Sequence, residues 1–138
     1  MLHLTFITVG DLPKGPFQDI GNEYKKRLAP FVKLDHRIVK TAENIEVPKD
    51  AFLVVLDENG KTYTSAEAAQ TIKRLEDDGL HVAVVLGGPK GLSDEMKTQA
   101  KLRLSLSPMT TTHDLAHIFF LEQLYRAFTI IRGKEYHY

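Results

Sequence analysis

Two uninterrupted apolar runs constrain the fold more than any other feature of this sequence. The first, at residues 51–56, ends in an Asp-Glu-Asn-Gly turn, and the second, at 82–86, runs directly into Gly-Gly-Pro-Lys-Gly. Short apolar runs bounded by turn residues are typical of strands that are covered on both faces, as in a parallel sheet. Parallel neighbours require a crossover, and apolar residues at helical spacing between the two runs supply one. The sequence therefore predicts a βαβ unit within an α/β fold.

The rest of the chain continues this alternation of strands and helices. Alternating apolar residues predict strands at 2–9 and 34–39 and a short strand at 102–106. Helical spacing predicts helices at about 17–28, 65–79, 93–101 and 113–129, the second of them capped by Ser65. The side chains that we expect to face the core are Phe17, Ile20, Tyr24, Leu28, Ala68, Ala69, Ile72, Leu75, Leu115, Ile118, Phe119, Leu124 and Phe128. Because we find no linker, repeat or low-complexity segment, we expect a single domain over residues 1–138 with a mostly parallel sheet.

Composition narrows the classes of function. The 138 residues include no cysteine, which excludes a disulfide scaffold, a thiolate zinc site and a cysteine nucleophile. The 18 Lys and Arg residues balance 18 Asp and Glu residues, so bulk charge does not favour nucleic-acid binding, although a local basic patch stays compatible. No apolar run approaches the roughly 20 residues that span a bilayer, and no targeting signal is visible. We therefore expect a cytoplasmic protein with no membrane partner.

The glycine-rich segment at residues 87–91 has two interpretations. It follows a predicted buried strand and precedes a helix, and in open α/β sheets ligands bind beyond the carboxyl ends of the strands. Its spacing matches neither the dinucleotide-binding pattern nor the phosphate-binding loop. A tight strand-to-helix turn without a ligand explains the glycines equally well.

Two histidines of the last predicted helix have the spacing of metal ligands. His113 and His117 stand four residues apart, and Asp114 occupies the position at which zinc proteases carry a glutamate. Aspartate is one methylene shorter, and no third ligand follows at a recognised spacing. We therefore expect no metal site and keep a metal hydrolase built on this pair as a less favoured alternative.

Polar and aromatic residues near the C-terminus form a further group of candidates. Glu122 and Arg126 stand four residues apart on a helix that is otherwise strongly apolar. The pair is either a surface ion pair or a device that turns Arg126 toward an anion. The aromatic ending at 136–138 suits stacking on a nucleobase or docking on a partner subunit. The basic cluster at 25–27 is interpreted as a solvated helix face.

Taken together, the motifs resemble the RlmH family, a group of SPOUT-class methyltransferases that modify large-subunit ribosomal RNA. The resemblance covers nearly the whole chain. The matching segments, in order, are Glu23-Tyr24-Lys25-Lys26-Arg27-Leu28, Val54-Val55-Leu56-Asp57-Glu58-Asn59-Gly60-Lys61 with Ser65, Leu86-Gly87-Gly88-Pro89-Lys90-Gly91-Leu92, Leu104-Ser105-Leu106-Ser107-Pro108-Met109-Thr110, His113, Glu122-Gln123-Leu124-Tyr125-Arg126-Ala127 and Tyr136-His137.

The resemblance implies a fold, a cofactor and a reaction. The fold would contain a C-terminal trefoil knot and would work as a homodimer. S-adenosylmethionine would bind at the knot, lined by Leu56, Gly87, Gly88, Leu106, Ser107, Pro108, Met109, Thr110 and Thr111. The reaction would be methylation of N3 of a pseudouridine, at position 1915 of the 23S rRNA, on the assembled ribosome. A relative that binds cofactor and ribosome without transferring a methyl group is the alternative.

The resemblance also implies roles for single residues. His137 would receive the N3 proton, Tyr136 would stack on the base, and both would act at the partner protomer's cofactor. Arg126, oriented by Glu122, would hold a phosphate, and the RNA-binding residues would be His113, Arg126 and Lys90. The sequence departs from the family at His117 and Tyr138, where arginine is usual, so we expect fewer phosphate contacts in the RNA-facing region.

Overall fold

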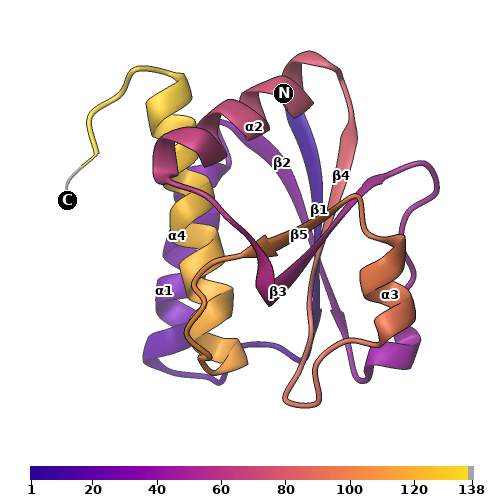
Figure 1. Cartoon of the computed structure of the whole chain (residues 1–138). Coiled ribbons are helices and arrows are strands. Elements are labelled where there is room, and N and C mark those ends of the chain that lie inside the picture. The colour runs from indigo at the N-terminus through magenta and orange to yellow at the C-terminus, as the bar shows by residue number, and fades with distance from the viewer. Residues whose placement is uncertain (137–138) are drawn as a thin grey trace.

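The structure, a computed structural model, describes residues 1–136 of the chain. Strands and helices alternate along it as the sequence predicts (Figure 1). The elements are β1 (Leu2–Val9), α1 (Pro16–Leu28), β2 (Val32–Val39), the 3₁₀ turn η1 (Ala42–Asn44), β3 (Phe52–Thr62), α2 (Ser65–Asp77), β4 (His81–Leu86), α3 (Asp94–Gln99), β5 (Leu102–Ser105) and α4 (His113–Ile131).

The strands form one five-stranded sheet in the order β2-β1-β4-β3-β5, and every pairing in it is parallel. β4 lies between β1 and β3, which accounts for its five consecutive buried residues. The two apolar runs pair directly, with Val54 of β3 opposite Val84 of β4. The predicted α/β fold with a parallel sheet is confirmed.

The two faces of the sheet carry different covers. Helices α1, α4 and α2 lie side by side on one face, with α4 in contact with both of the others, and α3 lies on the opposite face with η1 (Figure 1). Alternation along the strands divides the core accordingly. Phe6 and Val54 belong to the large cluster under α4, whereas Ile7 and Val55 belong to a smaller cluster that Met96 of α3 helps to cover.

β3 extends beyond the apolar run that predicts it. It continues to Thr62, and its register against β5 shifts between Leu56 and Lys61. The intervening residues bulge so closely over β5 that a Cβ at Gly60 would overlap the backbone carbonyl of Arg103. The predicted turn is therefore a bulge within a strand.

The N-cap of α2 differs from the prediction by one residue. Thr64 is the cap: its hydroxyl accepts a hydrogen bond from the amide of Glu67, whose carboxylate accepts one from the amide of Thr64. This reciprocal pair satisfies two amide groups that have no partner inside the helix. Ser65, the predicted cap, instead donates its hydroxyl to Gln123 of α4.

The inward faces of α1 and α4 were predicted only in part. Phe17 and Ile20 are 37% and 42% exposed, and Leu115 and Phe119 are 48% and 38% exposed. α4 buries another set, which is His117, Phe120, Leu121, Leu124, Ala127, Phe128 and Thr129. Because α4 is apolar almost all round, its periodicity does not select a face, and packing between α1 and α2 decides it. Within residues 1–136, no helix combines the length and apolar character that a membrane span requires.

Candidate functional site

The strand register brings the predicted cofactor segments to one edge of the sheet. Val55 pairs with Val85, so Leu56, the last residue of β3 before its bulge, lies beside the end of β4, from which Gly87 continues. Leu56 also pairs with Leu104, two residues before Leu106. Since these strands are parallel and adjacent, all three segments emerge together at the carboxyl edge, where open α/β sheets bind ligands.

The Gly87–Gly91 segment is a compact turn. Gly91 donates its amide to the carbonyl of Gly88 over 2.9 Å and adopts a φ of +72°. A Cβ on Gly87 would lie 3.0 Å from the Gly91 backbone, and one on Gly88 would lie 3.1 Å from Val9 of β1. The glycines are therefore required by local packing, as the tight-turn interpretation holds, and the turn also borders the carboxyl edge.

The loop between β5 and α4 presents hydroxyl groups and backbone to the surface. Pro108, Thr110 and Thr111 are exposed, Met109 is 79% exposed, and Leu106 and Ser107 are half-buried. Ser107 accepts the amide of Met109, and Thr112, which closes the loop, caps α4 by accepting the amide of Leu115. The loop is anchored at both ends, and the groups between them are accessible to a ligand.

The candidate catalytic residues gather on the outer face of α4. Arg126 donates to Oε1 of Glu122 from Nη2 over 3.2 Å, and the side-chain amide of Gln123 donates to the same oxygen from Nε2. The Arg126 guanidinium stands 4.5 Å from the ring centre of Tyr136. Oε2 of Glu122 is buried and has no hydrogen-bond partner among the described residues. The structure therefore brings Glu122, Arg126 and Tyr136 together within one chain.

Tyr136 is held by α1 and α4. Its hydroxyl lies 3.2 Å from the hydroxyl of Tyr24, and its ring meets Tyr125 edge to face at 4.9 Å. Burial and the hydrogen bond to Tyr24 raise the pKa of Tyr136 above its ordinary value. The phenol therefore stays protonated at neutral pH, which suits stacking rather than proton abstraction. His137 and Tyr138 lie outside the described residues.

Within one chain, this catalytic cluster is far from the cofactor segments. Arg126 stands 13 residues after His113, the first residue of α4, which corresponds to about 20 Å along the helix axis. The C-terminal segment continues past the end of α4 that is opposite the Gly87–Gly91 turn (Figure 1). A single protomer therefore does not bring the two sets of residues together.

The histidines of α4 lie in different environments. His113 is half-exposed, with Nε2 at 3.4 Å from Asp114. His117 is 3% exposed and packs edge to face on Phe6 and His36. The prediction that position 117 belongs to an RNA-facing surface is therefore wrong for this protomer. No group of three or more potential metal ligands occurs within residues 1–136, so the metal-hydrolase alternative gains no third ligand there.

A buried polar chain beside His117 was missed, because nothing in the sequence pairs its members. Lys25, predicted to be solvated, donates to Nδ1 of His36 over 2.7 Å. The Thr8 hydroxyl donates to the carbonyl of Gly10, so Thr8 accepts from Nε2 of His36. This arrangement requires a neutral imidazole, and burial lowers the pKa of both His36 and His117 to about 4.

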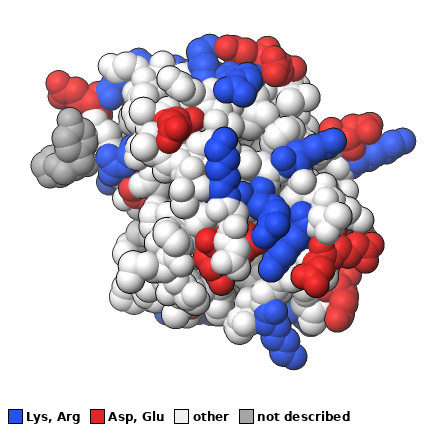
Figure 2. Space-filling view, in the orientation of Figure 1, with Lys and Arg blue, Asp and Glu red and all other residues white. Residues whose placement is uncertain are grey.

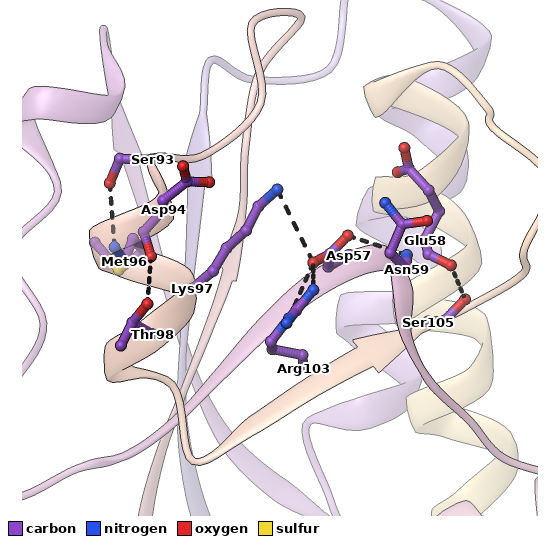
Figure 3. Close-up of polar contacts among 10 residues, drawn as sticks. All are labelled: Asp57, Glu58, Asn59, Ser93, Asp94, Met96, Lys97, Thr98, Arg103 and Ser105. Atoms are coloured by element: carbon purple, nitrogen blue, oxygen red, sulfur yellow. Dashed lines mark hydrogen bonds and ion pairs between the residues drawn. The ribbon is translucent and has the colours of Figure 1, made fainter.

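A second polar cluster, also missed, lies where β3 bulges (Figure 3). Oδ2 of Asp57 accepts hydrogen bonds from Nε and Nη2 of Arg103 over 3.1 and 2.9 Å, and its Oδ1 accepts from the amide of Asn59. Nζ of Lys97 lies 4.0 Å away. Burial alone would raise the pKa of Asp57, but these hydrogen bonds and charges outweigh it and hold the pKa below its ordinary value. The carboxylate is therefore ionised.

A cavity with a volume of about 320 Å³ lies between α2, α4 and β5. Tyr63, Ser65 and Gln123 line its polar part, and Phe119 and Phe120 line its apolar part. Of the predicted cofactor residues, only Leu106 contributes to it. The cavity thus borders the candidate site without containing the Gly87–Gly91 turn. Lys90, predicted to bind RNA, is exposed within that turn.

The chain matches a family described as "Predicted SPOUT methyltransferase" over residues 2–137. Three curated relatives carry the name ribosomal RNA large subunit methyltransferase H. The relative from Maridesulfovibrio salexigens is 41% identical, with 100% of this chain and 99% of the relative aligned. The relative from Coprothermobacter proteolyticus is 39% identical over 95% and 96% of the two chains. The relative from Flavobacterium psychrophilum is 31% identical over 99% of each.

Two solved structures share the fold at low sequence identity. A probable methylase family protein from Haemophilus influenzae superposes with a TM-score of 0.57 at 15% identity, covering 99% of this chain and 71% of that one. TrmJ from Z. mobilis gives a TM-score of 0.54 at 14% identity, with coverages of 92% and 70%. These similarities show that the arrangement of the parallel sheet and its helices is shared with the two proteins.

Proposed function

Because this chain belongs to the RlmH family of SPOUT methyltransferases, we propose that it methylates large-subunit ribosomal RNA with S-adenosylmethionine as donor. The acceptor is N3 of a pseudouridine, position 1915 of the 23S rRNA, in a stem-loop of the assembled ribosome. The observation that carries this proposal is the convergence of Leu56, Gly87 and Leu106 at one edge of the parallel sheet. The proposal includes the C-terminal trefoil knot that the resemblance implies.

The residues at the carboxyl edge fit S-adenosylmethionine. Leu56 and Leu106 offer half-buried apolar surface for an adenine ring, and Thr110 and Thr111 offer exposed hydroxyls for polar groups. Gly87 and Gly88 leave backbone without side chains beside them. When bound, the cofactor supplies a methyl group already activated on a sulfonium, so the protein's contribution is positioning and exclusion of water.

The chain's own residues then orient the RNA and remove a proton. Arg126, held by Glu122, presents a guanidinium suited to a phosphate. Tyr136, which is protonated and has the Arg126 guanidinium 4.5 Å from its ring centre, provides an aromatic surface on which a base can stack. The N3 proton must leave as the methyl group arrives, and His137, beyond the described residues, is the proposed acceptor.

The separation along α4 supports a site shared between two copies of the chain. Leu115, Phe119 and Ile130 are exposed apolar residues on the outer face of α4, at helical spacing with Glu122 and Arg126. A second copy of the chain that covers this face would bury apolar surface. It would also bring the cofactor loops of the second copy next to the catalytic cluster of the first. We therefore propose a homodimer in which each tail acts at the partner's cofactor.

Calorimetry with S-adenosylmethionine and its demethylated product tests the first step. We expect binding with micromolar affinity, and an absence of binding at millimolar ligand contradicts the proposal. Transfer of labelled methyl from the cofactor to ribosomes that lack the modification tests the second step. Binding without transfer would instead favour the inactive ribosome-associated alternative.

Two variants separate cofactor binding from catalysis. Deletion of residues 136–138 is expected to abolish methylation and leave cofactor affinity within about twofold, because Tyr136, the part of the tail that the structure describes, packs on Tyr24 and Tyr125 and not on the cofactor segments of its own chain. Leu106→Glu is expected to abolish cofactor binding, because it puts a carboxylate beside the cofactor loop. Mixing these two inactive variants restores part of the activity if the site is shared between protomers. A mixture that stays inactive, although it forms mixed dimers, contradicts the shared site.

A further inference from the structure

A basic surface on the α3 side of the sheet has no part in the steps above. Leu102 and Leu104 of β5 pack into the core under α4, so alternation directs the intervening Arg103, together with Lys101, to the other face. Lys97 of α3 reaches the same place. Figure 2 shows Lys and Arg side chains gathered over this part of the molecule. We call Lys97, Lys101 and Arg103 the basic patch.

Arg103 is anchored in a way that surface arginines seldom are. Asp57, whose side chain is 4% exposed, accepts two of its N–H groups, and the Arg103 side chain is 45% exposed. A guanidinium has five N–H donors, so three remain for a ligand. A planar fork held in one orientation is suited to a phosphate, because less side-chain freedom is lost on binding. Figure 3 shows Lys97 and Arg103 converging on Asp57 from α3 and β5.

Three cations meet at the patch. Asp57 is the one carboxylate that forms ion pairs with them among the described residues, Lys101 has no ion-pair partner there, and Asp94 and Glu95 lie in the first turn of α3. Lysines on an edge strand also prevent strands of other molecules from pairing with it. That role needs neither a buried carboxylate nor an anchored arginine, so the link from Asp57 to Arg103 favours a ligand.

The patch also adjoins the proposed site. Asp57 directly follows Leu56, and β5 leads into the loop that begins at Leu106. A polyanion lying across α3 and β5 would therefore pass beside both cofactor segments. We propose that Lys97, Lys101 and Arg103 form a phosphate-binding surface that holds the backbone of the substrate RNA beside the cofactor loops. This inference rests on the proposed function, and it gives a chain of zero net charge a local surface for a polyanion.

The test compares two triple variants of equal charge. One carries K97Q, K101Q and R103Q. The control carries K26Q, K33Q and K40Q, which replace exposed cations of α1, of β2 and of the position directly after β2, at the other end of the sheet. Affinity for ribosomes is measured against salt concentration, and affinity for S-adenosylmethionine is measured by calorimetry. The patch variant is expected to lose at least about tenfold in ribosome affinity, and its salt slope should flatten by about two to three. The control should stay within about twofold of the wild type, and cofactor affinity should be unchanged in both.

A second pair of variants leaves the buried carboxylate with its partner. Lys101→Glu and Lys33→Glu each reverse an exposed charge at an opposite edge of the sheet, and neither breaks an ion pair among the described residues. We expect Lys101→Glu to weaken ribosome binding and Lys33→Glu to leave it unchanged. Arg103→Lys keeps the charge but loses the planar guanidinium, and we expect it to weaken ribosome binding less than Lys101→Glu does.

The outcomes separate this inference from the function on which it rests. If the wild type binds neither cofactor nor ribosomes, the proposed function fails and this inference fails with it. If the wild type binds both and Lys101→Glu matches Lys33→Glu, the patch protects the sheet edge only, and this inference alone is overturned.

Discussion

Enclosed titratable side chains are neutral on one face of the sheet and charged on the other. Under α1 and α4, His36 and His117 are enclosed by aromatic rings, and burial keeps both neutral. On the face covered by the short helix α3, Asp57 is equally enclosed but stays ionised because Arg103 and Lys97 meet it. Burial removes a charge unless a partner is built beside it. The first face therefore keeps its buried titratable groups neutral, whereas the second holds a charged cluster that is available to a polyanion.

The largest expected difference between the faces is in packing. Phe128 of α4 is fully buried and stacks on Phe31. Phe128→Ala should lower the free energy of unfolding by about 3–5 kcal/mol. Met96→Ala on the α3 face should cost about 1 kcal/mol, because Met96 is only half-buried. Urea denaturation of both variants measures the difference. Equal losses would show that the two faces contribute alike.

Acid should act mainly through the neutral face. The pKa values of His36 and His117 are lowered to about 4 from 6.5, so the unfolded chain takes up protons first as the pH falls. Stability should therefore be full above about pH 6.5 and decline toward pH 4, by up to about 3 kcal/mol for each histidine. His117→Leu should show a shallower decline in denaturation midpoint than the wild type over this range. Parallel curves for the two proteins would contradict the prediction.

The charged face should be sensitive to the bulge that places Asp57. In Gly60→Ala, the added methyl group meets the carbonyl of Arg103, so β3 and β5 must separate locally. We expect a loss of about 1–3 kcal/mol in unfolding free energy, as for other overpacked sites. Asn59→Ala, an exposed neighbour on the same bulge, is the matched control and should cost less. A neutral Gly60→Ala would mean that the bulge is not held by this contact.

The smallest expected difference concerns helix caps. Thr64 caps α2 with a reciprocal pair of hydrogen bonds, whereas Ser93 caps α3 by accepting one amide, that of Met96. Thr64→Ala should therefore cost about 1–2 kcal/mol and Ser93→Ala about 0.5–1 kcal/mol. Thermal melts resolve this difference, and a reversed order would show that the second hydrogen bond adds nothing.

Much of the fold could be predicted from local patterns. The apolar runs before Asp57 and before Gly87 predict two buried strands, and a crossover between them makes a parallel pairing the simplest arrangement. The Gly87–Gly91 turn as a candidate ligand turn follows from the same reasoning, because loops after parallel strands lie at one edge, whereas Leu56 and the loop that begins at Leu106 are implied by the resemblance to the RlmH family. Where local patterns were ambiguous, predictions were wrong: α4 is apolar nearly all round, so Leu115 and Phe119 were assigned to the core and His117 to the RNA-facing surface.

The candidate site also has a part that local sequence patterns predict and a part that only the tertiary structure shows. The spacing of Glu122 and Arg126 is visible in the sequence, since residues four apart share a helix face. Their neighbour Tyr136 and the distance to the cofactor loops depend on where α4 and the tail lie. The link between Asp57 and Arg103 joins residues 46 positions apart, and no local pattern signals it.

The sequence by itself determined the order of strands and helices, the parallel sheet and the segments at its carboxyl edge, because hydrophobic periodicity and turn residues act over a few neighbouring positions. Only the tertiary structure decided which titratable groups stay charged. His117 and Asp57 are buried and His36 is half-buried, and their ionisation depends on burial and on partners contributed by distant elements. The ionisation state of each group depends on its burial and on its electrostatic interactions with other segments. These interactions give a neutral core and a charged surface beside the proposed site.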